Sequence, residues 1–343
     1  MSRIAQNSSN RLEWIDIAKG FAILWVVALH IGLLFDDNVF LQNLVFQSWT
    51  MPFFYVVSGL FINHKEDFRH FLGKKTNQLV VPLVFFVFLT NTMFWVVGDL
   101  LGGVKTGWIE RPPHWVSTIQ FCWYERHEDF RNFPIWFIPA LFNATLMYKC
   151  IIELTKDKWE LKIIGVCIIV GVMLLLQQLS INLPLFIDVG LLALPYMMVG
   201  DFLKNKSGFI SEKDSLGSEW KVGVFALLIF LSCYYVQATW NLFPIIDILK
   251  YVTAIAGTLF VLWTAKRIQR CSFLAYCGRN SIIILGVHLP LTAIRPFLMR
   301  FIFNEWLMKG VLLILIVAIA CGLCYLFNRF VPKLVGKEPL LNL

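Results

Sequence analysis

The first apolar stretch of the chain carries three ionisable residues that a membrane-spanning helix would normally exclude. Asp16, Lys19 and His30 lie within the segment WIDIAKGFAILWVVALHIGLLF. A separation of eleven residues brings the side chains of Lys19 and His30 to about the same face of an α-helix, roughly 16 Å apart along its axis. Asp16 lies on this face as well. Because ionisable groups inside a span are costly and usually face the protein interior, this helix face is a candidate site.

The three side chains favour a particular kind of chemistry. A lysine near one membrane surface can bind phosphate, and a neutral histidine deeper in the membrane can accept a proton as a general base. A ligand with phosphates at one end and a reactive group on a long, slender arm would match this separation, and an acyl-coenzyme A has that shape. Asp16 would orient Lys19 or stabilise the first helical turn. A buried polar His30 that only joins helices by hydrogen bonds is the alternative, which spacing alone leaves open.

The composition is that of an integral membrane protein. Of the 343 residues, 58% are apolar and 15% are charged, and the mean hydropathy is +0.69. Windows of about 18 to 22 mostly apolar residues predict an all-α bundle of about ten transmembrane helices, forming one membrane domain over residues 1–343. The windows lie near residues 17–35, 44–62, 79–97, 132–152, 161–179, 185–203, 222–240, 245–264, 274–294 and 309–330.

Lysine and arginine concentrate in alternate connecting segments, and this sets the orientation. By the positive-inside rule, these basic segments and both termini are predicted to be cytoplasmic. The net charge of +8 is then explained by topology, so we expect no nucleic-acid partner. The basic segments are 63–78, 153–160, 204–221 and 265–273.

The longest segment expected outside the membrane is 98–131, which contains several Trp, His and acidic residues. Aromatic faces beside carboxylates could stack on a sugar and hydrogen-bond to it, and Trp136 could help this loop to position a glycan. An ordinary interfacial belt of aromatic residues with a solvated loop is the alternative.

A second intramembrane histidine, His288, lies in CGRNSIIILGVHLPL. Counted from the cytoplasmic end of its helix, it reaches about the depth of His30, so the two rings could line one cavity; a role in helix packing is the alternative. Asn280 and Ser281 are typical of a helix N-cap at the cytoplasmic face, and Arg279 could contact phosphate there. On the second helix, Ser58 lies beside a glycine that allows close helix approach.

Five segments, by their order and spacing, resemble the acyltransferase-3 family of integral membrane O-acyltransferases, in particular its fucose 4-O-acetylase-like branch. They are WIDIAKGFAILWVVALH, MPFFYVVSGLF, KKTNQLVVP, WFIPALF and GRNSIIILGVH. The resemblance implies ten helices and transfer of an acyl group, commonly acetyl, from cytoplasmic acetyl-CoA to carbohydrate on the outer face. Acetyl-CoA would be a substrate, with no bound cofactor and no metal.

The resemblance also implies roles for single residues. Lys19 and His30 match the family's basic residue, ten intervening residues and histidine, with His30 in the catalytic position. His30 would either deprotonate a sugar hydroxyl for direct attack on the thioester or take part in relaying the acyl group across the membrane.

The chain departs from the family pattern at two positions. Lys75 matches the first member of a basic pair before the third helix, but the second member, often Arg, is Gln78 here. Lys74 could compensate by contacting phosphate. Thr50 stands where related enzymes often have His before Met-Pro.

We therefore expect an O-acyltransferase of the bacterial cytoplasmic membrane, with acyl-CoA, a carbohydrate acceptor and membrane lipids as partners, and with a homo-oligomer left open. We expect no appended hydrolase domain, so the membrane domain would complete the transfer or pass the acyl group to another protein. The main alternative is a transporter or flippase for a lipid-linked sugar or small anion. A non-enzymatic scaffold is a third, but it leaves Lys19 and His30 on one face unexplained.

Overall fold

The computed structural model describes residues 12–32, 49–96, 132–205, 220–239, 245–268 and 270–341. All regular elements in these ranges are helices, which confirms the predicted all-α class. The predicted outer segment 98–131 lies outside the described residues. In chain order the elements are α1 (Glu13–His30), α3 (Thr50–Leu60), α4 (Phe68–Lys75), the π-helical turn η2 (Thr76–Val80), α5 (Val81–Trp95), η5 (Phe133–Trp136), α7 (Phe137–Leu154), α8 (Trp159–Gln178), η6 (Pro184–Phe186), α9 (Ile187–Leu192), α10 (Leu194–Asn205), α12 (Trp220–Thr239), α13 (Ile245–Ile268), α14 (Ser272–Arg279), α15 (Ser281–Leu291), η7 (Thr292–Ile294), α16 (Arg295–Leu298) and α17 (Glu305–Phe330).

Several of these helices are long and apolar enough to cross a membrane, so the chain is a multi-pass membrane protein. In the described ranges there are five, or six if a helix pair bent by 51° counts as one span. The predicted count of about ten is not confirmed. Several predicted windows, among them 17–35, 44–62 and 222–240, extend beyond the described residues. Within the described ranges, α3 has 11 residues, and α1 includes three charged residues among its 18. The spans are Phe68–Trp95, Phe133–Leu154, Trp159–Gln178, Ser281–Leu298 and Glu305–Phe330, with the bent pair Pro184–Leu192 and Leu194–Asn205.

Three predicted helix boundaries are wrong. The helix expected from residue 79 begins at Phe68. Lys74 and Lys75 therefore lie on a helix and not on a connecting segment. The window 274–294 is divided at Asn280, whose backbone leaves helical geometry (φ −111°, ψ 19°). The window 185–203 bends after α9, where Pro195 in the first turn of α10 lacks the N–H that would continue the hydrogen-bond ladder.

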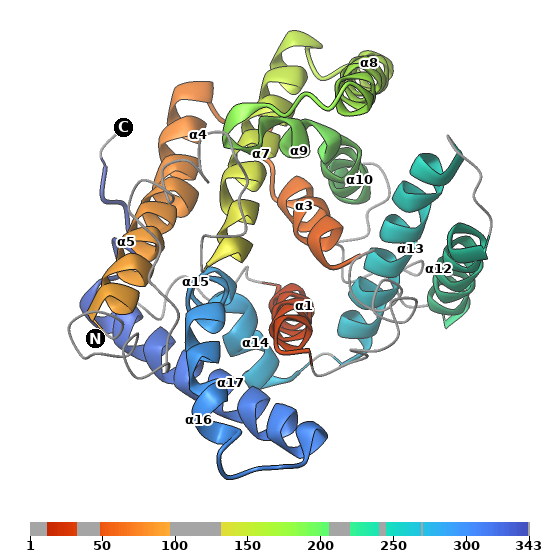
Figure 1. Ribbon diagram of the computed structural model, residues 1–343. Coiled ribbons are helices and arrows are strands. Elements are labelled where there is room, and N and C mark those ends of the chain that lie inside the picture. Colours follow the sequence, from red (N-terminus) through yellow and green to blue (C-terminus); the bar gives the residue numbers. More distant parts are fainter. Residues whose placement is uncertain are drawn as a thin grey trace.

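Helix α1 lies among α3, α13, α14 and α15 (Figure 1). Its contact with α14 is made backbone to backbone through two glycines. A β-carbon on Gly20 would lie 1.9 Å from the carbonyl oxygen of Leu274, and one on Gly278 would lie 1.8 Å from the carbonyl oxygen of Asp16. Small residues permit such close crossings in membrane proteins. This crossing packs the turn of α1 that carries Asp16 and Lys19 against α14, the helix that leads into α15.

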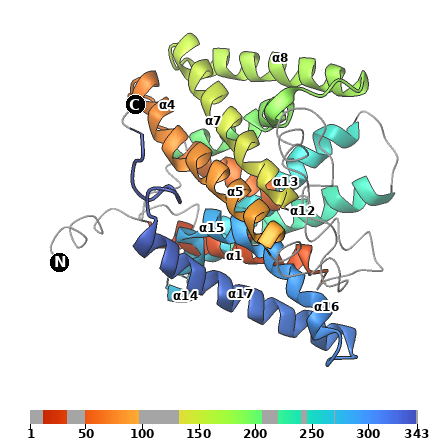
Figure 2. The ribbon, with the colours of Figure 1, turned by 60° about the vertical axis from the view of Figure 1, so that its left-hand side comes forward.

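The buried apolar core has two parts, and α1 contributes to both. Val26 and Val27 pack in one cluster with residues of α7, α15 and α17, whereas Ile17 and Ala18 pack in the other with α3 and α13. Helices α8 and α17 lie on opposite sides of the molecule (Figure 2). The polar face of α1 therefore lies inside the bundle, at the boundary between the two clusters.

Candidate functional site

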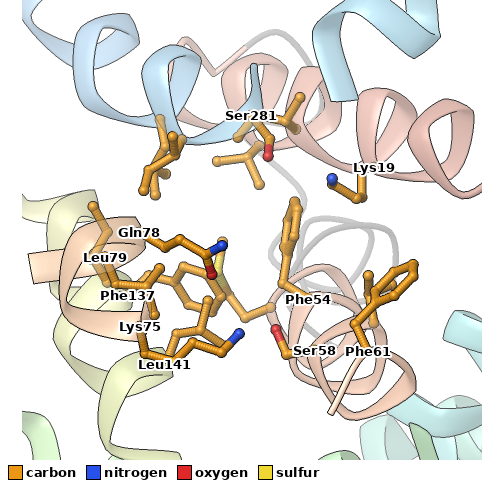
Figure 3. Close-up of a pocket in the computed structure, with 17 residues that line it drawn as sticks. Lys19, Phe54, Ser58, Phe61, Lys75, Gln78, Leu79, Phe137, Leu141 and Ser281 are labelled. Carbon is orange, nitrogen blue, oxygen red and sulfur yellow. The ribbon is translucent and has the colours of Figure 1, made fainter. Parts of the chain in front are cut away.

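A cavity of about 360 Å³ lies between α1, α3, α7, α15 and the segment formed by α4, η2 and α5. Five polar side chains line it: Lys19, Ser58, Lys75, Gln78 and Ser281 (Figure 3). The structure thus brings together four predicted site residues from four different helices, and Gln78 with them. The rest of the wall is apolar and consists of Ile23, Val26, Met51, Phe54, Val57, Phe61, Leu79, Phe137, Ile138, Leu141, Ile282 and Leu285.

Two lysines reach this cavity from different walls (Figure 3). Lys19 extends from α1, and its Nζ lies 3.3 Å from Oδ1 of Asp16, one turn earlier. Lys75 ends α4, and its Nζ lies 5.6 Å from the centroid of the Phe71 ring. Two ammonium groups that face one cavity favour an anionic ligand between them.

The wall that carries Lys75 and Gln78 contains the π-helical turn η2, a feature often found at functional sites. The residue that secures this turn, Asn77, was not predicted from the sequence. Asn77 is buried, and its Nδ2 donates to the carbonyl oxygens of Gly73 (3.0 Å) and Leu341 (2.9 Å). Its Oδ1 accepts from the backbone N–H groups of Leu340 and Leu341, both at 2.8 Å. Asn77 therefore fixes the C-terminal segment to the cavity wall.

The two intramembrane histidines meet one helical turn beyond the cavity wall. His30 follows the lining residue Val26 by four positions, and His288 follows the lining residue Leu285 by three. Their ring centroids are 5.0 Å apart, and Nε2 of His288 lies 3.3 Å from Nδ1 of His30. The ring of Phe133 also lies beside His30, with the two ring centroids 5.4 Å apart. Along α1, Lys19 thus lies at the depth of the cavity, and His30 lies further on, where it meets His288.

Hydrogen bonds to backbone carbonyls assign the tautomers of both rings. Nδ1 of His30 lies 2.8 Å from the carbonyl oxygen of Val26, and Nδ1 of His288 lies 2.9 Å from that of Leu285. A carbonyl only accepts, so each Nδ1 carries a proton. In the neutral rings, Nε2 of His288 then accepts a second, weaker contact from Nδ1 of His30. Nε2 of His30 is left with its lone pair, which is the state that a general base requires.

Two predicted phosphate-binding residues do not line the cavity. Nζ of Lys74 lies 3.3 Å from both carboxylate oxygens of Glu66, on the exposed side of α4. Arg279 ends α14, and its carbonyl oxygen accepts from Nζ of Lys337 at 2.6 Å. The expectation that Lys74 compensates for Gln78 is not met by this geometry, because adjacent helical residues point about 100° apart.

Two further residues have structural contacts away from the cavity. Asn280 precedes α15, but its side chain does not cap that helix as predicted. Its Nδ2 donates to the carbonyl oxygen of Tyr276, and its Oδ1 accepts from Asn328 at 2.8 Å. Asn280 therefore joins the break between α14 and α15 to α17. Trp136 packs against the ring of Phe186, with centroids 6.0 Å apart.

A second polar cluster was not predicted from the sequence. His64 lies 2.8 Å from both Asp157 and Asp201, which are 93 and 137 residues away in sequence. Each of these residues alone resembles a solvated loop or helix-end residue, so no local pattern could have predicted the cluster. In the part of the chain that the structure describes, no group of three His, Cys, Asp or Glu side chains could hold a metal ion.

Comparison with known proteins gives one finding. A family model described as an acyltransferase domain matches residues 12–329. The matched range begins just before α1 and ends within α17, so it contains both the cavity and the histidine pair. No curated protein and no solved structure matches the chain.

Proposed function

The chain belongs to the acyltransferase-3 family and is a membrane acyltransferase, and from this premise we propose that it transfers an acetyl group from cytoplasmic acetyl-CoA to a hydroxyl of a cell-surface or lipid-linked carbohydrate. One observation supports this proposal above the others: a cavity with two lysines, Lys19 and Lys75, is followed at greater depth by His30 and His288. We place the enzyme in the bacterial cytoplasmic membrane.

The cavity suits the shape of the donor. Lys19 and Lys75 would hold phosphates of acetyl-CoA, and Gln78 would add an uncharged N–H donor beside them. The apolar wall would take the slender arm that carries the thioester. From Lys19 to His30 the axis of α1 rises by roughly 16 Å, so this arm would bring the thioester to the histidine pair.

His30 would act as the general base. Its Nε2 takes the proton from the acceptor hydroxyl as the hydroxyl oxygen forms a bond to the thioester carbonyl carbon. When the C–S bond breaks, the leaving thiolate takes the proton back from the imidazolium. The products are an acetyl ester and free coenzyme A. His288 would hold the tautomer of His30, because its Nε2 can accept only from a protonated Nδ1.

Two adjacent lysines allow a matched test of the donor site. We expect Lys75→Gln to raise the KM for acetyl-CoA about tenfold with kcat nearly unchanged, because one charge-assisted contact to phosphate is lost. Lys74→Gln removes the same charge from the exposed side of α4, where the side chain faces Glu66, and should leave the KM within about twofold. Steady-state kinetics on membrane vesicles measures both. Equal effects of the two substitutions would contradict a phosphate role for Lys75.

The proposed function itself is tested on the acceptor. Mass spectrometry of cell-surface glycans from cells with and without the intact protein should show acetyl esters that depend on the protein. Transfer of labelled acetyl from acetyl-CoA to the same glycan in membrane vesicles would establish the donor. Counterflow of unmodified substrate without any dependence on acetyl-CoA would instead favour the transporter alternative.

A further inference from the structure

Three segments that the positive-inside rule assigns to the cytoplasmic face meet around a second cavity of about 530 Å³. They are the turn after α3, the turn between α7 and α8, and the end of α10. Their contact agrees with the prediction that all three lie at the same membrane face, since segments on opposite faces of the membrane could not touch. The lining residues are Ile62, Asn63, His64, Lys65, Asp157, Trp159, Lys162, Lys204 and Asn205.

A network of ion pairs gives this cavity a rigid floor. Nδ1 of His64 lies 2.8 Å from Asp157, and its Nε2 lies 2.8 Å from Asp201. Nζ of Lys162 lies 2.7 Å and 2.9 Å from the same two carboxylates, and the hydroxyl of Tyr148 donates to Asp201 at 2.8 Å. Every member is hydrogen-bonded, so the network orders the three segments relative to one another.

His64 contributes a positive charge to the floor. Both of its ring nitrogens face carboxylates and therefore both donate. The hydrogen bond to Asp201 raises the pKa of His64; burial opposes this effect, and the hydrogen bond to Asp157 reinforces it. The buried Lys149 fixes the same turn by donating to the carbonyl oxygens of Asn63 (3.3 Å) and His64 (3.1 Å).

The cavity carries an excess of positive charge. In its floor, the protonated His64 and Lys162 are balanced by Asp157 and Asp201, so the excess comes from Lys65 and Lys204. Lys204 uses one N–H for the carbonyl oxygen of Ile62 (2.9 Å), which leaves two donors. Lys65 is exposed at the rim, and its ammonium takes no part in the ion pairs of the floor. The cavity therefore favours an anion.

Apolar side chains lie beside these cations. The ring of Trp159 is 5.8 Å from the ring of Phe202 on α10, and Phe202 is 44% exposed. Ile163, one turn further along α8, is 38% exposed. A tryptophan beside exposed apolar residues and lysines is typical of the membrane interface. The ligand that fits both parts is an amphiphile with an anionic head.

We propose that this second cavity binds the phosphate of an anionic phospholipid headgroup at the cytoplasmic face, with Lys65 and Lys204 as the phosphate contacts. Basic pockets between transmembrane helices on this face are suited to such headgroups. The acyl chains would pass beside Trp159, Phe202 and Ile163. The phosphates at the nucleotide end of acetyl-CoA could be bound by the same lysines. The experiment below therefore distinguishes a lipid phosphate from a phosphate of acetyl-CoA.

Native mass spectrometry of the purified full chain in detergent, with phosphatidylglycerol or phosphatidylcholine added at equal concentration, measures the binding. We expect the chain to retain phosphatidylglycerol preferentially. The double substitution Lys65→Gln and Lys204→Gln should weaken that retention about 30-fold. The matched control, Lys156→Gln with Lys158→Gln, removes two exposed charges from the neighbouring turn that do not line the cavity, and should retain the lipid.

The single substitution Lys65→Gln controls for misfolding, because it leaves the ion pairs of the floor in place. We expect it to weaken the retention of phosphatidylglycerol about fivefold. Calorimetric titration of the same variants with acetyl-CoA should show unchanged affinity. A loss of acetyl-CoA affinity with unchanged lipid retention would assign the phosphate to the donor and overturn the lipid proposal. Equal retention of both lipids, or equal loss in the two double variants, would also overturn it. Neither lipid readout depends on acetyl transfer.

Discussion

Replacing His30 by alanine is expected to abolish acetyl transfer without lowering the amount of protein in the membrane. His30 is the residue whose Nε2 keeps a lone pair once Nδ1 is bound to the carbonyl oxygen of Val26. A well-placed general base contributes about 10²- to 10⁴-fold to the rate, so we expect the remaining rate of acetyl transfer to be lower than the wild-type rate by this factor. Transfer of radiolabelled acetyl from acetyl-CoA to glycan in membrane vesicles measures the rate, and immunoblotting of the same vesicles measures the protein.

His288→Ala provides the comparison for this result. It removes the second acceptor of Nδ1 of His30 at 3.3 Å but leaves the shorter bond to Val26, so we expect a smaller loss, about tenfold, mainly in kcat. If His288→Ala were the more damaging of the two, the assignment of base and positioning residue would have to be exchanged. Activity near wild type in His30→Ala would refute base catalysis by His30 altogether.

The part of the site that could be predicted is the part that lies on one helix. Asp16 and Lys19 are three positions apart on α1, and helical geometry alone brings their side chains to 3.3 Å. Hydropathy also predicts the all-helical class, because an apolar run is a local property, but it does not place every helix boundary. That His30 and His288 lie at one depth followed from counting residues along two helices, but their 3.3 Å contact depends on how α1 and α15 pack.

Other features depend on register and on long-range contacts, which a single sequence does not reveal. Lys74 and Lys75 are neighbours, yet only Lys75 lines the cavity, because the helix that carries them begins at Phe68 and fixes which side each one faces. Asn77 has partners about 260 residues downstream, at Leu340 and Leu341. The predicted cap at Asn280 failed because its side chain bonds to another helix.

Replacing Gly278 by alanine is expected to prevent the chain from folding into a stable, monodisperse protein. The added β-carbon would lie 1.8 Å from the carbonyl oxygen of Asp16 and 2.8 Å from the backbone nitrogen of Gly20. Both are backbone atoms, so no side-chain rotation can relieve the clash, and α1 and α14 must separate. Overpacking of a core typically costs about 1–3 kcal/mol, and a backbone clash belongs at the upper end.

Fluorescence-detected gel filtration after a temperature ramp measures this loss. Gly171→Ala is the control, because a β-carbon at this position of α8 meets no atom within 4 Å, and it should match wild type or exceed it slightly through higher helix propensity. A wild-type melting profile for Gly278→Ala would contradict the close crossing of α1 and α14. Since this crossing holds the turn of Asp16 and Lys19, acetyl transfer should decline together with folded protein, whereas His30→Ala should lose transfer while the protein stays folded. The two substitutions therefore separate the packing that positions the site from the chemistry that the site performs.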